Sequence, residues 1–298
     1  MAVDWLRAQI LRYGLVVWFA ANSVVGIAYA ARDTSLLYFD ARLYLMATRT
    51  WLEGGDPWSV QLAGNYFAAP PPSLLPLAPL SLLPLDVGVA IVAFACFAAA
   101  VATVRMLRLP WWWLFFPPLV QCLLSANVHA LLIPLILAGA GWLATFLKAY
   151  AAPIIVILGR WRAALVALVS VAATAPLLPW PAYFSQFGSI NAHLVEQTHY
   201  ALPTVALMAV SPAALLAMAI VGRQRAAWLA VPALWPSQQY YYGTLAMGAR
   251  NDLAAALVAF PIPGSGLLAL LVCALVSLRR DGRPAWLRWP VVIGPSAR

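Results

Sequence analysis

Long uncharged apolar segments are the feature that most constrains how this chain can fold. Residues 15–31, 87–104, 163–178 and 201–221 contain no charged side chain, and each segment approaches the roughly 20 residues that a helix needs to cross a bilayer. The whole sequence is 64% hydrophobic and 9% charged, against about 45–50% apolar and about 25% charged in soluble domains. A soluble fold of 298 residues could not bury so much apolar surface. The sequence therefore predicts an all-α polytopic membrane protein.

The formal net charge of +9 comes from arginines that gather at the ends of these apolar segments. Arginine clusters in short loops mark the cytoplasmic side of a membrane protein. We therefore expect one transmembrane domain over residues 1–298, with about eight to ten crossings. Both termini are expected in the cytoplasm, and the protein in the inner cell membrane. Nucleic-acid binding is not expected, because no basic stripe alternates with exposed aromatic residues.

The first expected outer loop, residues 32–86, differs from the rest of the chain. It carries five of the nine acidic residues. Residues 40–53 are good helix formers without proline or glycine, and Gly-Gly-Asp-Pro at 54–57 ends the pattern. The 3.6-residue period places Asp40 and Tyr44 on one face. The segment is therefore expected to form an amphipathic helix in the membrane interface.

Other segments are too irregular for simple crossings. Six prolines between residues 70 and 84 are spaced too closely for one regular helix. This stretch is therefore expected to dip into the bilayer beside a binding site. Residues 127–160 fit one full helix and a short re-entrant piece that carries Lys148. A second outer loop is expected at residues 180–203. Helices are also expected over residues 111–125 and 253–278, the latter broken by Pro-Ile-Pro-Gly at 261–264.

Asp40, Arg42 and Lys148 are charged residues that could carry chemistry. A partly desolvated carboxylate is suited to act as a general base, although Asp is also a preferred helix cap. Arg42, with Arg32 and Arg49, could clamp a phosphate, or each could pair with nearby acids or lipid headgroups. Lys148 lies in an apolar segment, which is costly unless it faces a cavity or a counter-charge. It could anchor a phosphate, or its ammonium could extend to the membrane interface.

The histidines and cysteines suggest no metal chemistry. His193 and His199 lie in the second outer loop, where one of them is expected to contact substrate. His129 follows Asn127 at a helix start and is expected to form a hydrogen bond between helices. The three cysteines are isolated in apolar segments, which indicates packing rather than a zinc site or disulfides. No metal-ligand set or nucleotide-binding motif is present, so neither a metal nor another cofactor is expected.

A series of motifs runs through the first outer loop and continues more weakly beyond it. An acid and a Tyr are followed by Gly-Gly-Asp-Pro-Trp, Asn-Tyr-Phe and a Pro-Pro pair. In this order they resemble the polyprenyl-phosphate-sugar-dependent glycosyltransferases of the GT-C superfamily, most closely glycosyltransferase family 87. The matching residues are Asp40, Tyr44, Asp56, Tyr66, Pro71, Pro72, Asn127 and Lys148.

The resemblance implies a GT-C-like membrane fold, a polyprenyl-phosphate-linked sugar donor and a glycan or glycolipid acceptor at the outer face. The sugar would be mannose or arabinofuranose, and membrane lipids would surround the enzyme. Asp40 would be the general base of an inverting transfer, without a metal. The donor phosphate would be held by Arg42, Lys148 and His199. The substrate loop would include Tyr44, Asp56, Tyr66, Asn127 and His193.

Two other functions stay open at this point. The broken helices and the intramembrane cation also suit a transporter of lipids or solutes. Departures from the family pattern, such as Ser125-Ala126 where the family has Gly-Gln, suit a non-catalytic relative that acts as a membrane scaffold.

Overall fold

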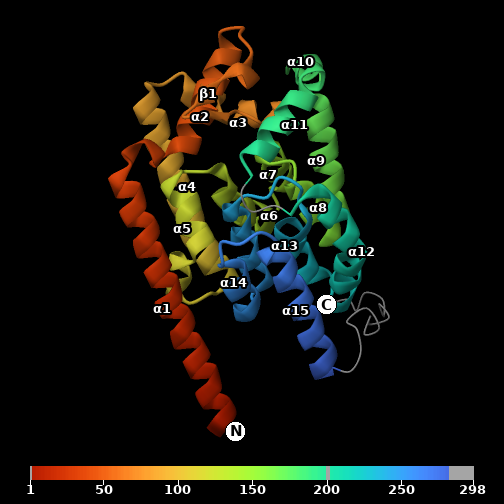
Figure 1. Cartoon of the computed structure of the whole chain (residues 1–298). Helices are drawn as coiled ribbons and strands as arrows, with labels where there is room; N and C mark the ends of the chain where they lie inside the picture. Colours follow the sequence, from red (N-terminus) through yellow and green to blue (C-terminus); the bar gives the residue numbers. More distant parts are fainter. Residues whose placement is uncertain (1, 199–201, 282–298) are drawn as a thin grey trace, which may run out of the picture.

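The computed structural model describes residues 2–198 and 202–281 of the chain (Figure 1). These residues are mostly helical, and their only strands form one short hairpin. Three of the described helices include segments that are long and apolar enough to cross a membrane, by length and composition: Tyr13–Arg32, Leu85–Leu107 and Thr204–Val221. The prediction of a helical membrane protein is confirmed at this level. The number of crossings stays a prediction.

The first part of the fold runs from α1 through the expected outer loop to α4. α2 forms where the helix formers predict it and ends before Gly54, whose φ of 82° is accessible to glycine because it has no Cβ. An antiparallel hairpin follows, in which Gln61 pairs with Tyr66. The elements are α1 (Ala2–Arg32), η1 (Thr34–Leu36), α2 (Phe39–Leu52), η2 (Pro57–Ser59), β1 (Gln61–Leu62), β2 (Asn65–Tyr66), η3 (Pro71–Ser73), α3 (Leu74–Ser81) and α4 (Leu85–Leu107).

As expected, the proline-rich stretch does not form one regular helix. It is divided into the short η3 and the eight-residue helix α3, and Pro84 lies beyond the end of α3. Pro76 falls in the first turn, where a backbone N–H needs no helical partner, and Pro79 lies inside a helix of eight residues. A helix this short tolerates the missing hydrogen bond because its ends are held by neighbouring elements.

The middle of the chain is more broken than expected. The predicted helix over residues 111–125 is divided at Phe116, because Pro117 and Pro118 begin a new helix. The predicted full helix within residues 127–160 is wrong, since short helices separated by turns at Gly139 and Lys148 replace it. The elements are η4 (Trp111–Phe115), α5 (Pro117–Leu124), η5 (Val128–Leu131), α6 (Leu132–Leu137), α7 (Gly141–Leu147), α8 (Ala151–Ile157) and α9 (Trp161–Ala173).

The last part of the fold follows the sequence more closely. The expected second outer loop contains two short helices, and the expected break at residues 261–264 divides α14 from α15. The elements are α10 (Trp180–Ser185), α11 (Phe187–Glu196), α12 (Thr204–Val221), α13 (Arg223–Leu234), η6 (Tyr240–Ala249), α14 (Asp252–Val258) and α15 (Ser265–Asp281).

The two expected outer loops lie at the same end of the molecule. Figure 1 shows α10, α11 and the hairpin at one end, while the N-terminus of α1 and the end of α15 lie at the other. This arrangement agrees with two loops on one side of a membrane and both ends of the described chain on the opposite side.

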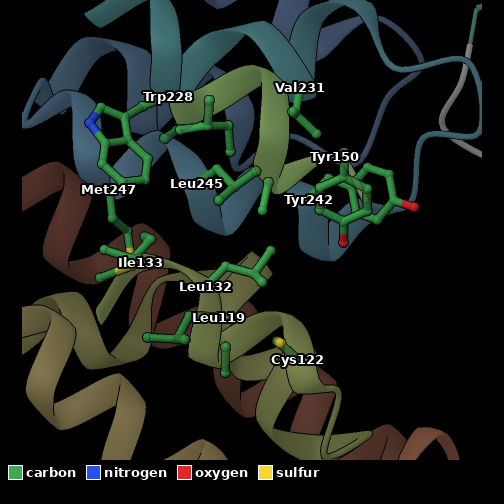
Figure 2. Packing of buried hydrophobic residues seen from close by; sticks show 14 of the residues in the cluster. Leu119, Cys122, Leu132, Ile133, Tyr150, Trp228, Val231, Tyr242, Leu245 and Met247 are labelled. Carbon is green, nitrogen blue, oxygen red and sulfur yellow. The ribbon is translucent and has the colours of Figure 1, made fainter. Parts of the chain in front are cut away.

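The core forms where α5, α6, α8, α13 and η6 meet. Figure 2 shows Leu119 of α5 and Ile133 of α6 on one side and Leu245 and Met247 of η6 on the other, with Trp228 of α13 next to Met247. All five side chains are buried, and each buried aliphatic or aromatic side chain contributes about 1.5–3 kcal/mol of transfer free energy. The three cysteines are free and buried, as expected of packing residues.

Arg49 holds the end of α3 against α2. Its Nε donates to the carbonyl oxygen of Ser81 at 3.0 Å, and its Nη2 donates to the carbonyl oxygens of Ser81 and Leu83 at 2.8 and 2.6 Å. These carbonyls belong to the last residue of α3 and to the turn after it, where no helical N–H reaches them. α2 therefore packs against both α3 and α4, and its buried residues, which include Leu43, lie on more than one face.

Replacing Arg49 by Met is expected to lower the free energy of unfolding by about 2 kcal/mol, because the carbonyls lose charge-assisted hydrogen bonds. Arg42→Met is the matched control. Arg42 pairs with Asp86 at 3.1 Å, but 38% and 83% of the two side chains are exposed, so its loss should cost about 1 kcal/mol or less. Denaturant unfolding in detergent micelles measures both values. Equal losses would show that Arg49 is no more than a surface charge.

Candidate functional site

A cavity of about 1010 Å³ lies between the outer-loop elements and the helices below them. Its walls come from α1, α2, the hairpin, α5, α10, α11, the turn after α7 and the segment that leads into η6. Four residues that the sequence singled out line it: Asp40, Tyr44, Tyr66 and Lys148. These residues lie as far as 108 positions apart in the sequence (148 − 40), and the fold brings them to one site.

The start of α2 is held in place by the end of α5. The backbone N–H of Tyr38 donates to the carbonyl of Leu124 at 2.8 Å, and that of Asp40 donates to the carbonyl of Ser125 at 3.0 Å. Free N–H groups at a helix start and free carbonyls at a helix end are complementary in both hydrogen bonding and dipole. This junction positions Asp40 at the cavity.

The Asp40 side chain does not cap its helix. The N-cap residue is Tyr38, which has a left-handed φ of 58° and makes no side-chain cap. Within the described part of the chain, the Asp40 carboxylate has no hydrogen bond and no ion pair. The structure therefore favours an available carboxylate over the capping role.

Tyr44 lies one turn after Asp40 on the same face of α2. It is buried and meets Phe67 edge to face, with ring centroids 5.2 Å apart. Burial, with a smaller effect of the Asp40 charge, raises the pKa of the Tyr44 phenol above its ordinary value. The phenol is therefore neutral at physiological pH.

Lys148 occupies the break between α7 and α8, where its backbone is extended. The residue is 8% exposed, and it lines the cavity rather than extending to a membrane interface. Its Nζ lies 5.0 Å from the centroid of the Tyr44 ring and 5.8 Å from that of Tyr241. No carboxylate of the described residues lies within ion-pair distance of it. The structure therefore supports the cavity-facing interpretation of this cation.

Three other candidate residues lie outside the cavity and have structural partners. Arg42 pairs with Asp86, an acid that the sequence did not suggest as its partner. Asp56 caps η2, because its Oδ1 accepts from the N–H of Trp58 at 3.1 Å. Asn127 is fully buried, and its Oδ1 accepts from the N–H of His129 at 2.9 Å.

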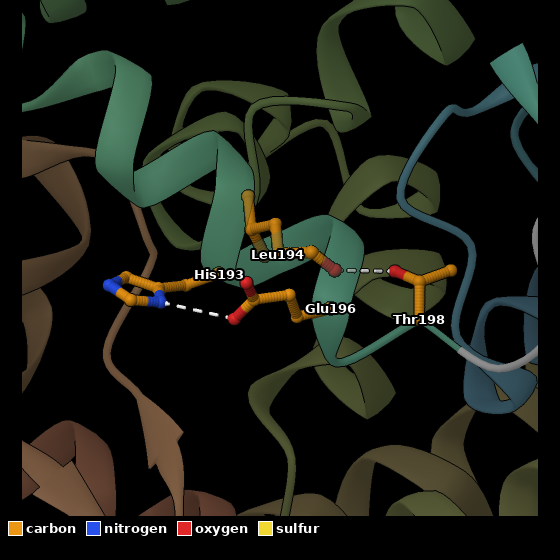
Figure 3. A network of polar contacts seen from close by, with 4 residues as sticks. All are labelled: His193, Leu194, Glu196 and Thr198. Atoms are coloured by element: carbon orange, nitrogen blue, oxygen red, sulfur yellow. Dashed lines mark hydrogen bonds and ion pairs between the residues drawn. The ribbon is translucent and has the colours of Figure 1, made fainter.

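α11, which belongs to the segment expected to be the second outer loop, covers one side of the cavity. His193 does not line the cavity, but its ring stacks on Tyr66, which does, with centroids 3.9 Å apart. Figure 3 shows its ion pair with Glu196, in which Nδ1 and Oε2 are 3.6 Å apart, and the hydrogen bond from Thr198 to the Leu194 carbonyl. Burial raises the pKa of the nearby Tyr183 phenol, which also lines the cavity. His199 lies outside the described residues.

Several lining residues were missed by the sequence analysis. Gln121 of α5, Tyr150 of the turn before α8 and Tyr241 of η6 all line the cavity. Two sequence features could have indicated them: the run of three tyrosines at 240–242, and the polar Gln121 within an apolar segment. His129 was predicted as a hydrogen-bonding residue, and its Nδ1 lies 2.6 Å from the Tyr150 hydroxyl.

No group of three or more His, Cys, Asp or Glu residues in the described chain could hold a metal ion. The charged side chains that line the cavity are those of Asp40 and Lys148, and much of the remaining wall is aromatic. Comparisons with protein families, curated proteins and solved structures find no match to this chain.

Lys148→Met is expected to stabilise the fold, because it removes a buried charge that has no carboxylate partner while keeping a side chain of similar length. The free energy of unfolding should rise by about 1 kcal/mol. Denaturant unfolding in micelles measures the change, and Arg49→Met, which is expected to lower stability, is the control. A clear loss of stability in Lys148→Met would mean that the ammonium is compensated by contacts beyond the two tyrosine rings.

Proposed function

We propose that this chain is a membrane glycosyltransferase that moves a sugar from a polyprenyl-phosphate donor to a hydroxyl group of a glycan or glycolipid. The observation that carries the proposal is that one cavity is lined by two charged side chains that do not form an ion pair, the Asp40 carboxylate and the Lys148 ammonium. A sugar transfer of this kind needs a base for the acceptor hydroxyl and a positive charge for the leaving phosphate.

In the proposed reaction Asp40 takes the proton of the acceptor hydroxyl as its oxygen bonds to the anomeric carbon. The bond between that carbon and the phosphate oxygen breaks, and its electron pair goes to the phosphate. The configuration inverts, and polyprenyl phosphate leaves. Lys148 would offset the negative charge that grows on the leaving oxygen. Mannose and arabinofuranose are the sugars proposed from the family resemblance.

The proposal includes a location and an orientation. The protein would lie in the inner cell membrane with about eight to ten crossings, with cytoplasmic termini and with both outer loops at the acceptor side. The position of the hairpin, α10 and α11 at one end of the molecule supports this orientation (Figure 1). The donor would enter from the membrane and the acceptor from the outer face.

Transfer of radiolabelled sugar from polyprenyl-phosphate-mannose and polyprenyl-phosphate-arabinose to membrane acceptors tests the proposal. Asp40→Asn should reduce transfer about a hundredfold or more, because general-base catalysis is lost while the shape of the side chain is kept. The matched control is Asp33→Asn. Asp33 belongs to the same outer loop, but it is exposed and its carboxylate accepts from the N–H of Ser35 at 3.1 Å.

The outcomes separate the proposal from its rivals. Equal transfer by the unmodified protein and Asp40→Asn would remove Asp40 from the mechanism. No transfer from either donor, together with net movement of the lipid across a vesicle membrane, would favour a transporter. Full biological function of Asp40→Asn in cells, without transfer by the purified protein, would favour a scaffold.

A further inference from the structure

The surroundings of Lys148 are unusual for a buried cation. Its ammonium lies beside the faces of two aromatic rings that come from distant parts of the chain, Tyr44 of α2 and Tyr241 of η6. Both distances are within the range of about 6 Å in which the negative face of a ring attracts a cation. The rings therefore supply part of the stabilisation that a carboxylate normally provides to a buried lysine.

A carboxylate is available in the same cavity, yet Lys148 does not pair with it. Asp40 lines the cavity, but no ion pair joins the two residues. Tyr44 explains the separation, since it follows Asp40 by one helical turn and its ring lies beside the Lys148 ammonium. In a direct ion pair the Asp40 carboxylate would accept hydrogen bonds from the Lys148 ammonium, so neither group would be fully available to a ligand. Ring faces attract the cation without using its N–H donors.

We propose that Tyr44 and Tyr241 are positioning residues that hold the Lys148 ammonium away from Asp40 and present its N–H donors to an anionic ligand of the phosphate-ester class. This inference rests on the proposed function for the identity of the lipid part of the ligand. It goes beyond that function by assigning a role to Tyr241 and by giving a reason why two opposite charges in one cavity stay apart.

Tyr241 is the better residue to test, because Tyr44 lies one turn from the proposed base Asp40 on α2. Both tyrosines also pack against other rings, Tyr44 against Phe67 and Tyr241 against His129 and Tyr242. Tyr241→Phe keeps the ring face, whereas Tyr241→Leu removes it. Tyr29→Leu is the control for the loss of an exposed tyrosine at the same cavity. Tyr29 lines the same cavity from α1, and among the described residues it makes no cation–π contact with Lys148.

The experiment compares the affinities of polyprenyl phosphate and of polyprenol of equal chain length for the full chain in lipid nanodiscs, by microscale thermophoresis. The unmodified protein should prefer the phosphate by about tenfold or more, since the ammonium donates charge-assisted hydrogen bonds. Lys148→Met should abolish the preference. Tyr241→Phe and Tyr29→Leu should keep it within about twofold, and Tyr241→Leu should lose about fivefold or more.

A rescue variant separates positioning from simple packing. If Tyr241→Leu lets Lys148 pair with Asp40, then adding Asp40→Asn should restore most of the preference for the phosphate. A packing defect would not be repaired by that change. Should Tyr241→Leu fail to fold, the pair Tyr44→Phe and Tyr44→Leu provides the same comparison.

Full preference in Tyr241→Leu, or equal weakening of both lipids, would overturn the positioning role. Equal binding of both lipids by the unmodified protein would overturn the anion site itself. Because no sugar is transferred in this assay, absence of glycosyltransferase activity leaves its result intact. Conversely, if the positioning role is overturned, the transfer assay still tests whether Asp40 acts as the general base.

Discussion

Breaks within apolar segments determine where this molecule can have a polar site. A backbone that leaves the helical conformation at membrane depth has to be shielded by protein or to line a cavity, because lipid offers no hydrogen bonds. Lys148 lies at the break between α7 and α8, and Tyr241 lies beyond the break that follows α13. Both line the same cavity. The helix break at Lys148 and the break after α13 therefore lie around the same cavity.

Helix ends that meet one another keep this arrangement in place. The first turn of α2 donates to the carbonyls at the end of α5, and Arg49 donates to the carbonyls at the end of α3. Groups that a regular helix leaves without partners are thus used as contacts between elements. Because the outer-loop helix α2 is fixed at its start by α5 and along its length by α3 and α4, Asp40 is held on a rigid element rather than on a free loop.

The cavity keeps two opposite charges without neutralising either. Burial of an ammonium without a carboxylate partner costs stability, and a structure optimised for stability alone would replace Lys148 or pair it. The tyrosine rings beside Lys148 reduce that cost without occupying its hydrogen-bond donors. The proposed transfer requires such an arrangement, because it binds an anion and activates a hydroxyl group. It is also the reason that stability and activity are expected to respond in opposite directions to changes at Lys148.

The sequence alone determined the features that depend on composition and local pattern. Apolar runs predicted α1, α4 and α12, helix formers followed by Gly-Gly predicted α2, and the Pro-Ile-Pro-Gly turn predicted the division of α14 from α15. Tertiary structure decided what depends on contacts between distant segments. Sequence spacing could not reveal that Arg42 pairs with Asp86, that Asp56 and Asn127 serve as caps outside the cavity, or that Tyr241 reaches Lys148. Local patterns report on hydrogen bonds and burial within a few turns, whereas a binding site is formed by side chains that only the folded chain brings together.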